Sequence, residues 1–181
     1  HGKKLSMFLP DCQEFLGEIQ VLDIRLSREY VNKTEAAYTL LEESDIRSRL
    51  LHRDDFAHKG SMGNALLIAG SYGMSGAAIL ASRACLRSGV GKVTVHTPRK
   101  NYGIMQVTYF SESVDSDDFD ALGIGPGLGQ QENTAIAFIT QLKRAQCPVV
   151  VDADGLNILA NHRAWITQLP KGIILTPHPK E

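Results

Sequence analysis

From residue 64 onward, short apolar runs alternate with glycine-rich loops and with amphipathic stretches. Continuous apolar runs bounded by glycine or proline are typical of strands buried in a parallel sheet. The predicted strands span residues 64–69, 92–97, 121–124, 148–151 and 173–176. Apolar residues three and four positions apart predict helices at 76–87, 101–107, 132–145, 155–160 and 163–168. This alternation indicates an α/β fold with right-handed crossovers and helices on both faces of a parallel sheet.

The first sixty residues follow a different pattern and are rich in charge. They carry 20 charged side chains, whereas the following 121 residues carry 19. Residues 18–24 alternate apolar and polar positions and predict a strand. Residues 44–51, with Ser44 as N-cap, predict a short helix. We therefore expect a separate segment over residues 1–43 and a main domain over residues 44–181.

Composition and charge exclude several classes of protein. Hydrophobic residues make up 43% and charged residues 22%, which is typical of a globular protein. A net charge of −1 gives no positive field for nucleic acid or a membrane surface. No apolar run approaches the ~20 residues of a membrane span. Cys12, Cys85 and Cys147 are odd in number and have no metal-ligand spacing, which favours a reducing compartment and a cytoplasmic protein.

Two glycine loops each follow a predicted strand and precede a predicted helix. The loop at 70–78 lets the backbone approach a ligand closely, although a tight turn without a ligand has the same signature. The loop at 123–129 has glycine at every second position, which favours an anion-binding nest. The first loop does not have the spacing of a Walker A loop, and the second does not match the dinucleotide fingerprint.

Polar motifs follow two later strands. Asp152 and Asp154 come directly after the strand at 148–151, where open α/β sheets bind ligands, and could accept a cation or a hydroxyl. The alternative for Asp154 is a helix N-cap. His178, between two prolines, follows the last strand on a rigid backbone; a lone histidine is more often structural than catalytic.

In their order, these four motifs and the segment at 58–60 resemble those of the ADP- or ATP-dependent NAD(P)H-hydrate dehydratases. The resemblance runs from about Ser44 to Glu181. It implies a three-layer αβα parallel sheet of the ribokinase-like kind, incomplete at its C-terminus. Residues 8–10 and 21–24 look like the tail of the epimerase domain that bifunctional members carry in front. Because only the last strand of that domain falls within these residues, epimerase activity is not implied.

The resemblance also implies a reaction and a set of ligands. The family removes water from hydrated NADH or NADPH, using ADP or ATP with Mg²⁺, and so repairs the cofactor. The positions that match those holding the hydrated dinucleotide are Gly76, Ala77, Gly127, Leu128, Gly129 and His178. The positions that match those near the nucleotide and Mg²⁺ are Asp154, Asn157 and Glu181.

One family motif is absent from these residues. Family members continue to a Gly-x-Gly-Asp motif whose aspartate is the catalytic base, and no such motif occurs here. We therefore assign no catalytic residue, expect the 181-residue chain alone to be inactive, and leave any metal ligands unassigned. The strand at 173–176 would be an unpaired sheet edge, which more chain or a partner usually covers, and we expect a homo-oligomer.

Two alternatives remain open. A ribokinase-like kinase for a small molecule, such as a vitamin precursor, would leave phosphate on its acceptor, whereas a dehydratase releases it. A non-catalytic nucleotide-binding or oligomerisation module would neither phosphorylate an acceptor nor release phosphate.

Overall fold

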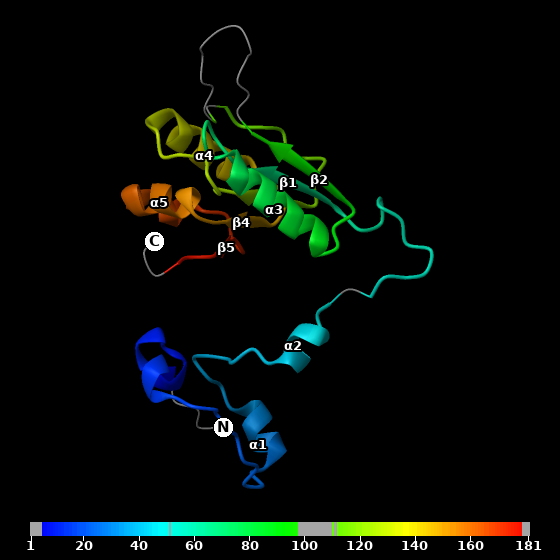
Figure 1. The fold of residues 1–181 in the computed structure, drawn as a ribbon, viewed down its shortest axis with the longest axis vertical. Coiled ribbons are helices and arrows are strands. Elements are labelled where there is room, and N and C mark those ends of the chain that lie inside the picture. The colour runs from blue at the N-terminus through cyan, green and yellow to red at the C-terminus, as the bar shows by residue number, and fades with distance from the viewer. Residues whose placement is uncertain (1–4, 51, 98–109, 111, 179–181) are drawn as a thin grey trace, which may run out of the picture. The chain divides into compact units, whose positions relative to one another are not determined.

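The computed structural model describes residues 5–50, 52–97, 110 and 112–178, and the chain divides into two compact units (Figure 1). The first unit is His1–Arg53 and the second is Asp54–Glu181. The helix predicted at 101–107 lies outside the described residues.

The first unit consists of short helices joined by extended chain. Its elements are the 3₁₀ helices η1 (Leu5–Phe8) and η2 (Pro10–Phe15) and the α-helices α1 (Arg28–Lys33) and α2 (Glu43–Arg47). None of its residues whose exposure is described is buried. Because a helix of four to six residues is marginal on its own, this unit has little to hold it rigid.

Two predictions for the first unit are wrong in detail. No strand forms at 18–24, because alternation creates a strand only where a neighbouring strand pairs with it; Leu22 and Ile24 are 77% and 72% exposed. The helix expected at 44–51 is α2, which begins after Glu42 rather than Ser44 and ends at Arg47. The carboxylate of Asp45 accepts a hydrogen bond from the N–H of Glu42 at 2.9 Å and so closes the first turn.

The second unit is a parallel α/β structure, as predicted. Its elements are β1 (Asn64–Ile68), α3 (Ser75–Arg87), β2 (Lys92–His96), β3 (Ala121–Ile124), α4 (Glu132–Arg144), β4 (Val149–Val151), α5 (Asp154–Asn161), η3 (Arg163–Gln168) and β5 (Ile174–Leu175). The strand order is β2-β1-β3-β4-β5, and every pair is parallel. Among the described strands, β5 pairs with β4 alone and is an edge, as expected.

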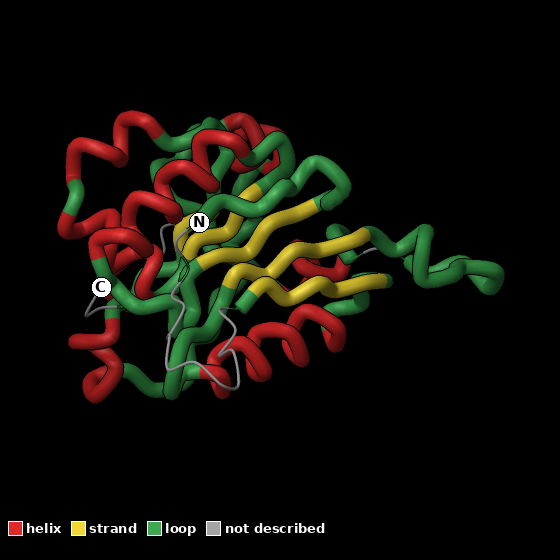
Figure 2. Tube along the Cα trace, turned by 90° about the horizontal axis from the view of Figure 1, so that it is seen from above, coloured by secondary structure: helices red, strands yellow, loops and turns green. Residues whose placement is uncertain are grey.

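Burial divides the sheet into two unequal faces. Leu66, Leu122 and Val149 lie in register across three strands and are at most 3% exposed, in the core that α4 and α5 complete. Figure 2 shows helices on both sides of the strands.

The opposite face is only partly covered. Leu67 and Val150 line a cavity of about 420 Å³ together with Ala81 and Cys85 of α3, which places α3 on this face. Val150 is nevertheless 38% exposed. The prediction of helices on both faces is therefore confirmed for α3, α4 and α5, while β4 stays open on the side of Val150.

The helices and strands predicted on the described residues of the second unit are confirmed with ends that differ by one or two residues, with one correction. The segment at 163–168 is a 3₁₀ helix. The helix α3 lies on the sheet through Ala78, Ala81 and Cys85, whereas Leu86 is 53% exposed. Within the described residues, no helix is long and apolar enough to cross a membrane.

Candidate functional site

The two glycine loops meet where the strand order changes direction. The chain runs from β1 outward to β2 and then returns past β1 to β3, so β1 and β3 are neighbours whose following loops lead apart. In open α/β sheets this switch point, at the carboxyl ends of the strands, is where ligands bind. The loop at 70–74 follows β1 and the loop at 125–131 follows β3.

Direct contacts join these loops. The N–H of Gly70 donates to the carbonyl oxygen of Pro126 at 2.8 Å. Gly127 has a φ of +64°, and a Cβ atom on it would lie 2.8 Å from the Cβ of Ala77 and 3.1 Å from that of Met74. Only glycine allows this approach, so Gly127 and Ala77, both predicted to bind the substrate, are adjacent through their backbones. Gly76 precedes Ala77 in the first turn of α3.

The motif that follows β4, which begins at Asp152, packs against the loop after β3. A Cβ atom on Gly125, whose φ is +132°, would lie 1.9 Å from the carbonyl oxygen of Asp152. That carbonyl accepts a hydrogen bond from the N–H of Gly155 at 3.0 Å. The absence of a side chain at Gly125 therefore lets the turn that begins α5 reach the glycine loop.

Asp154 holds this loop with its side chain. Its Oδ2 accepts a hydrogen bond from the N–H of Gly129 at 2.9 Å, and its Oδ1 accepts one from Nε2 of Gln130 at 3.1 Å. The N-cap of α5 is Ala153, so the alternative of Asp154 as an N-cap is wrong; its carboxylate turns toward the loop after β3 instead of capping its own helix.

Most N–H groups of the predicted nest at 123–129 are already engaged. Gly125 donates to Ile68, Leu128 donates to the carbonyl of Gly125, and Gly129 donates to Asp154. Gly127 is buried, and its N–H has no acceptor among the described residues. The expected nest is therefore largely filled by the chain's own acceptors, and it leaves one N–H group for a ligand.

The other residues predicted for the site are Leu128, Asn157, His178 and Glu181. Leu128 is 0% exposed and its side chain belongs to the hydrophobic core, so it contributes only its backbone to the glycine loop. Asn157 is half-buried on α5, one turn beyond Asp154. His178 is exposed, two residues after the motif's Thr176, and Glu181 lies outside the described residues.

Sequence reasoning missed a link between the third and fourth motifs. Oγ1 of Thr176 donates to Oδ1 of Asp152 at 2.9 Å, and the N–H of Thr176 donates to the carbonyl oxygen of Val151 at 3.2 Å. Both residues also line one end of the 420 Å³ cavity. Their shared position directly after neighbouring strands was the available signal.

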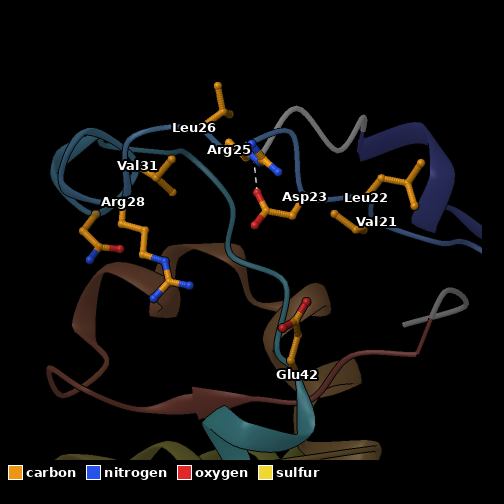
Figure 3. Close-up of a pocket in the computed structure, with 9 residues that line it drawn as sticks. Val21, Leu22, Asp23, Arg25, Leu26, Arg28, Val31 and Glu42 are labelled. Carbon is orange, nitrogen blue, oxygen red and sulfur yellow. Dashed lines mark hydrogen bonds between the residues drawn. The ribbon is translucent and has the colours of Figure 1, made fainter.

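A separate hollow lies within the first unit. It has a volume of about 620 Å³ and is lined by residues of 21–32 and by Glu42 (Figure 3). Asp23, one of its polar side chains, accepts a hydrogen bond from the N–H of Arg25 at 2.8 Å. None of the predicted site residues lines this hollow, so it is not the candidate site.

Comparison with solved structures defines the class of fold. A ribokinase-like protein from Enterococcus faecalis matches with a TM-score of 0.62 over 81% of this chain and 57% of its own, at 24% identity. The fold is therefore ribokinase-like, with the glycine loops at its switch point.

The family follows from the sequence. The family model described as NAD(P)H-hydrate dehydratase matches residues 65–181, and the chain belongs to this family. A bifunctional NAD(P)H-hydrate repair enzyme from Moorella thermoacetica is 32% identical over 98% of this chain. The crystal structure of an ADP/ATP-dependent NAD(P)H-hydrate dehydratase from Bacillus subtilis, co-crystallised with ATP and Mg²⁺, matches 64% of this chain at 35% identity with a TM-score of 0.53. The chain spans 38% of the first relative and 46% of the second.

Proposed function

We propose that this protein removes water from hydrated NADH or NADPH, with ADP or ATP as phosphoryl donor, and so restores the reduced cofactor. The observation that carries the proposal is the contact of Gly127 with Ala77 at the switch point of a chain that belongs to the dehydratase family. The similar enzyme from Bacillus subtilis, crystallised with ATP and Mg²⁺, supports a nucleotide as the second ligand.

The hydrated dinucleotide would bind along the two glycine loops. The N–H group of Gly127 has no acceptor among the described residues, so it would donate a hydrogen bond to the ligand. Gly76 and Ala77 would border the ligand from α3, with Leu128 and Gly129 contributing backbone only. His178 would contact the ligand from the segment after β5.

Asn157, Asp154 and Glu181 remain the residues proposed to lie near the nucleotide. The described residues do not by themselves fit Mg²⁺: they contain no group of three His, Cys, Asp or Glu side chains that could hold a metal ion. Both carboxylate oxygens of Asp154 already accept hydrogen bonds. We therefore propose Mg²⁺ only as a companion of the nucleotide and assign no step to it.

The chain's own residues supply binding rather than proton transfer in this proposal. A general base must lie within hydrogen-bond reach of the hydroxyl that it activates. Asp152 is held by Thr176 and Asp154 by the glycine loop, so we assign neither the role of base. Turnover by the 181-residue chain alone is not expected.

The test is an assay of the protein expressed from its whole coding sequence, with hydrated NADH and either ADP or ATP. We expect the absorbance of NADH to recover and inorganic phosphate to be released. Phosphate that stays on an acceptor would support the small-molecule kinase instead. Binding of nucleotide without either product would support the non-catalytic module, and no recovery of NADH under any condition would contradict the proposal.

A glycine pair provides a matched control for this assay. Gly127→Ala places a methyl group 2.8 Å from Ala77 and should abolish recovery of NADH. Gly17→Ala, where the added Cβ has no atom within 4 Å, should leave it unchanged. Equal activity of the two variants would argue against a substrate site at the loop contact.

We further propose a cytoplasmic homo-oligomer. The free thiols of Cys12, Cys85 and Cys147 support a reducing compartment, and the one-sided pairing of β5 among the described strands supports a covering partner. Light scattering of the purified protein tests the oligomer; a monomer at micromolar concentration would contradict it.

A further inference from the structure

A relay of side-chain hydrogen bonds ties the glycine loop to both ends of α5. Asp154, the first residue of the helix, binds the N–H of Gly129 at 2.9 Å and the side chain of Gln130 at 3.1 Å. The side-chain oxygen Oε1 of Gln130 accepts a hydrogen bond from Nδ2 of Asn161, the last residue of the helix, at 3.4 Å. The loop after β3 is therefore fastened to an element that follows β4.

This fastening acts on a part of the loop that needs support. Gly127 and Gly129 both have positive φ, at +64° and +83°. Glycine populates many backbone conformations in the unfolded chain, so holding it in one is costly and requires contacts from elsewhere. A hydrogen bond to a carboxylate is about twice as strong as one between neutral groups, and Asp154 supplies such a bond next to Gly127.

We infer that Asp154 is a positioning residue, whose carboxylate fixes the glycine loop in the conformation that places Gly127 against Ala77. It does so without contacting the nucleotide or Mg²⁺. This inference rests on the proposed function, because it gives the reason why the loop must be fixed: the substrate needs a preformed surface at Gly127.

The distribution of charge supports this role over direct contact with phosphate. Asp154 is half-buried, and each of its carboxylate oxygens already accepts a hydrogen bond from the loop. A phosphate brought against it would meet a like charge, and like charges repel most strongly where water is excluded. Asp154 also lies in the first turn of α5, where a carboxylate is stabilised by the helix dipole.

The test compares two substitutions in the protein expressed from its whole coding sequence. Asp154→Asn keeps an oxygen for the N–H of Gly129, and the Gln130 amide can turn to accept from the new amide group. Asp154→Ala removes both acceptors. We expect Asp154→Ala to raise the KM for hydrated NADH by about tenfold or more, the loss expected for a charged hydrogen bond, with kcat and the KM for nucleotide nearly unchanged. Asp154→Asn should rescue most of this loss.

Direct coordination of Mg²⁺ or nucleotide would give a different result. Asp154→Asn would then fail as badly as Asp154→Ala, and the loss would appear in the dependence on Mg²⁺ and nucleotide; that result would overturn the inference. Asp117→Ala, at an exposed aspartate away from the loop, is the matched control and should change no constant.

Two further outcomes are separable. If the unsubstituted protein does not act on hydrated NADH, the proposed function fails. If it acts and Asp154→Ala retains the unsubstituted KM, the inference alone fails. Should Asp154→Ala not fold, Asp154→Asn decides: normal dependence on nucleotide and Mg²⁺ supports positioning, and an altered dependence refutes it.

Discussion

Ala153 occupies a backbone conformation that favours glycine. Its φ is +50° and its ψ is −120°, between Asp152, which is bound to Thr176, and Asp154, which is bound to the loop at Gly129. A non-glycine residue in such a region costs about 1–3 kcal/mol and persists where the surroundings impose it. Two aspartates held by different elements impose it here.

Replacing Ala153 by glycine should therefore stabilise the protein. The relief of backbone strain exceeds the larger entropy that glycine loses on folding, by about 1 kcal/mol. Thermal denaturation measures the change as a higher Tm. Ala160→Gly, at an exposed position inside α5, should lower the Tm by a similar amount. Destabilisation by both variants would show that Ala153 is not strained.

At Gly125 we expect the opposite effect, because there the replacement of glycine should destabilise the protein. With a φ of +132° and a Cβ position 1.9 Å from the carbonyl oxygen of Asp152, Gly125→Ala should lower the free energy of unfolding by roughly 3 kcal/mol or more. Gly76→Ala, where a Cβ meets nothing within 4 Å in the first turn of α3, should be neutral or stabilising by up to ~1 kcal/mol. Chemical denaturation of the two variants compares them directly, and similar values would contradict the close approach of α5 to the loop.

His96 gives the stability a dependence on pH. Burial lowers the pKa of this imidazole, which lies edge-on to Phe110 with ring centroids 5.8 Å apart. Because the folded-state pKa lies below the unfolded one, the unfolded state binds the proton first, and stability falls as the pH drops through about 6.5. His96→Gln should flatten this part of the pH profile of Tm, whereas His52→Gln, at an exposed residue of the first unit, should not. Identical slopes for all three proteins would contradict it.

At the scale of elements, α4 joins the sheet and the segment before β3. Its apolar side is buried in the core, and Gln141 on the same side is 0% exposed. Oε1 of Gln141 accepts from the N–H of Val114 at 2.6 Å, and its Nε2 donates to the carbonyl oxygen of Val114 at 3.0 Å. The amide thus satisfies both backbone groups of one residue, as a neighbouring strand would.

Gln141→Leu should cost about 2 kcal/mol of stability, because it leaves the N–H and carbonyl of Val114 without partners. Gln146→Leu, at an exposed residue after the helix, should cost less than ~0.5 kcal/mol. Urea denaturation of the two variants gives the comparison. A loss for Gln141→Leu as small as that for Gln146→Leu would mean that water or another group replaces the amide.

The sequence predicts the elements of the second unit because their signals are local. The apolar run at 121–124 and the period of Ala135, Ile139 and Leu142 each reflect one buried face. The strand expected at 18–24 fails because pairing depends on a partner that the alternation does not specify. The hydrogen bond of Asp154 could not be predicted for the same reason, since its partner Gly129 lies 25 residues away. The site motifs were identifiable, but not the bonds between them.

At the scale of the whole molecule, the two units differ in how firmly they are held. The first has no buried residue among those whose exposure is described, whereas the second contains a continuous core around Phe138 and Leu142. Regions with few buried contacts open with little free energy, and proteases cleave such regions first.

Limited trypsin digestion should therefore cut first within the first unit, at Arg25, Arg28, Arg47, Arg49 or Arg53. Lys143 and Arg144 are as exposed to solvent but lie in the last turn of α4, and they should be cut later. Mass spectrometry of the fragments over time gives the order. Early cleavage at Lys143 would show that α4 is not the stable element that its burial indicates.

The link between Thr176 and Asp152 has a consequence for synthesis on the ribosome. The two residues are 24 positions apart, so β4 and the strained turn at Ala153 leave the ribosome before the hydroxyl that holds Asp152 does. During that interval the growing chain can bring the loops after β1 and β3 together, while the start of α5 lacks its support from β5. The start of α5 is therefore fully supported only once Thr176 has emerged, and a pause that keeps Thr176 inside the ribosome would leave the nascent protein with its glycine loops incompletely fastened.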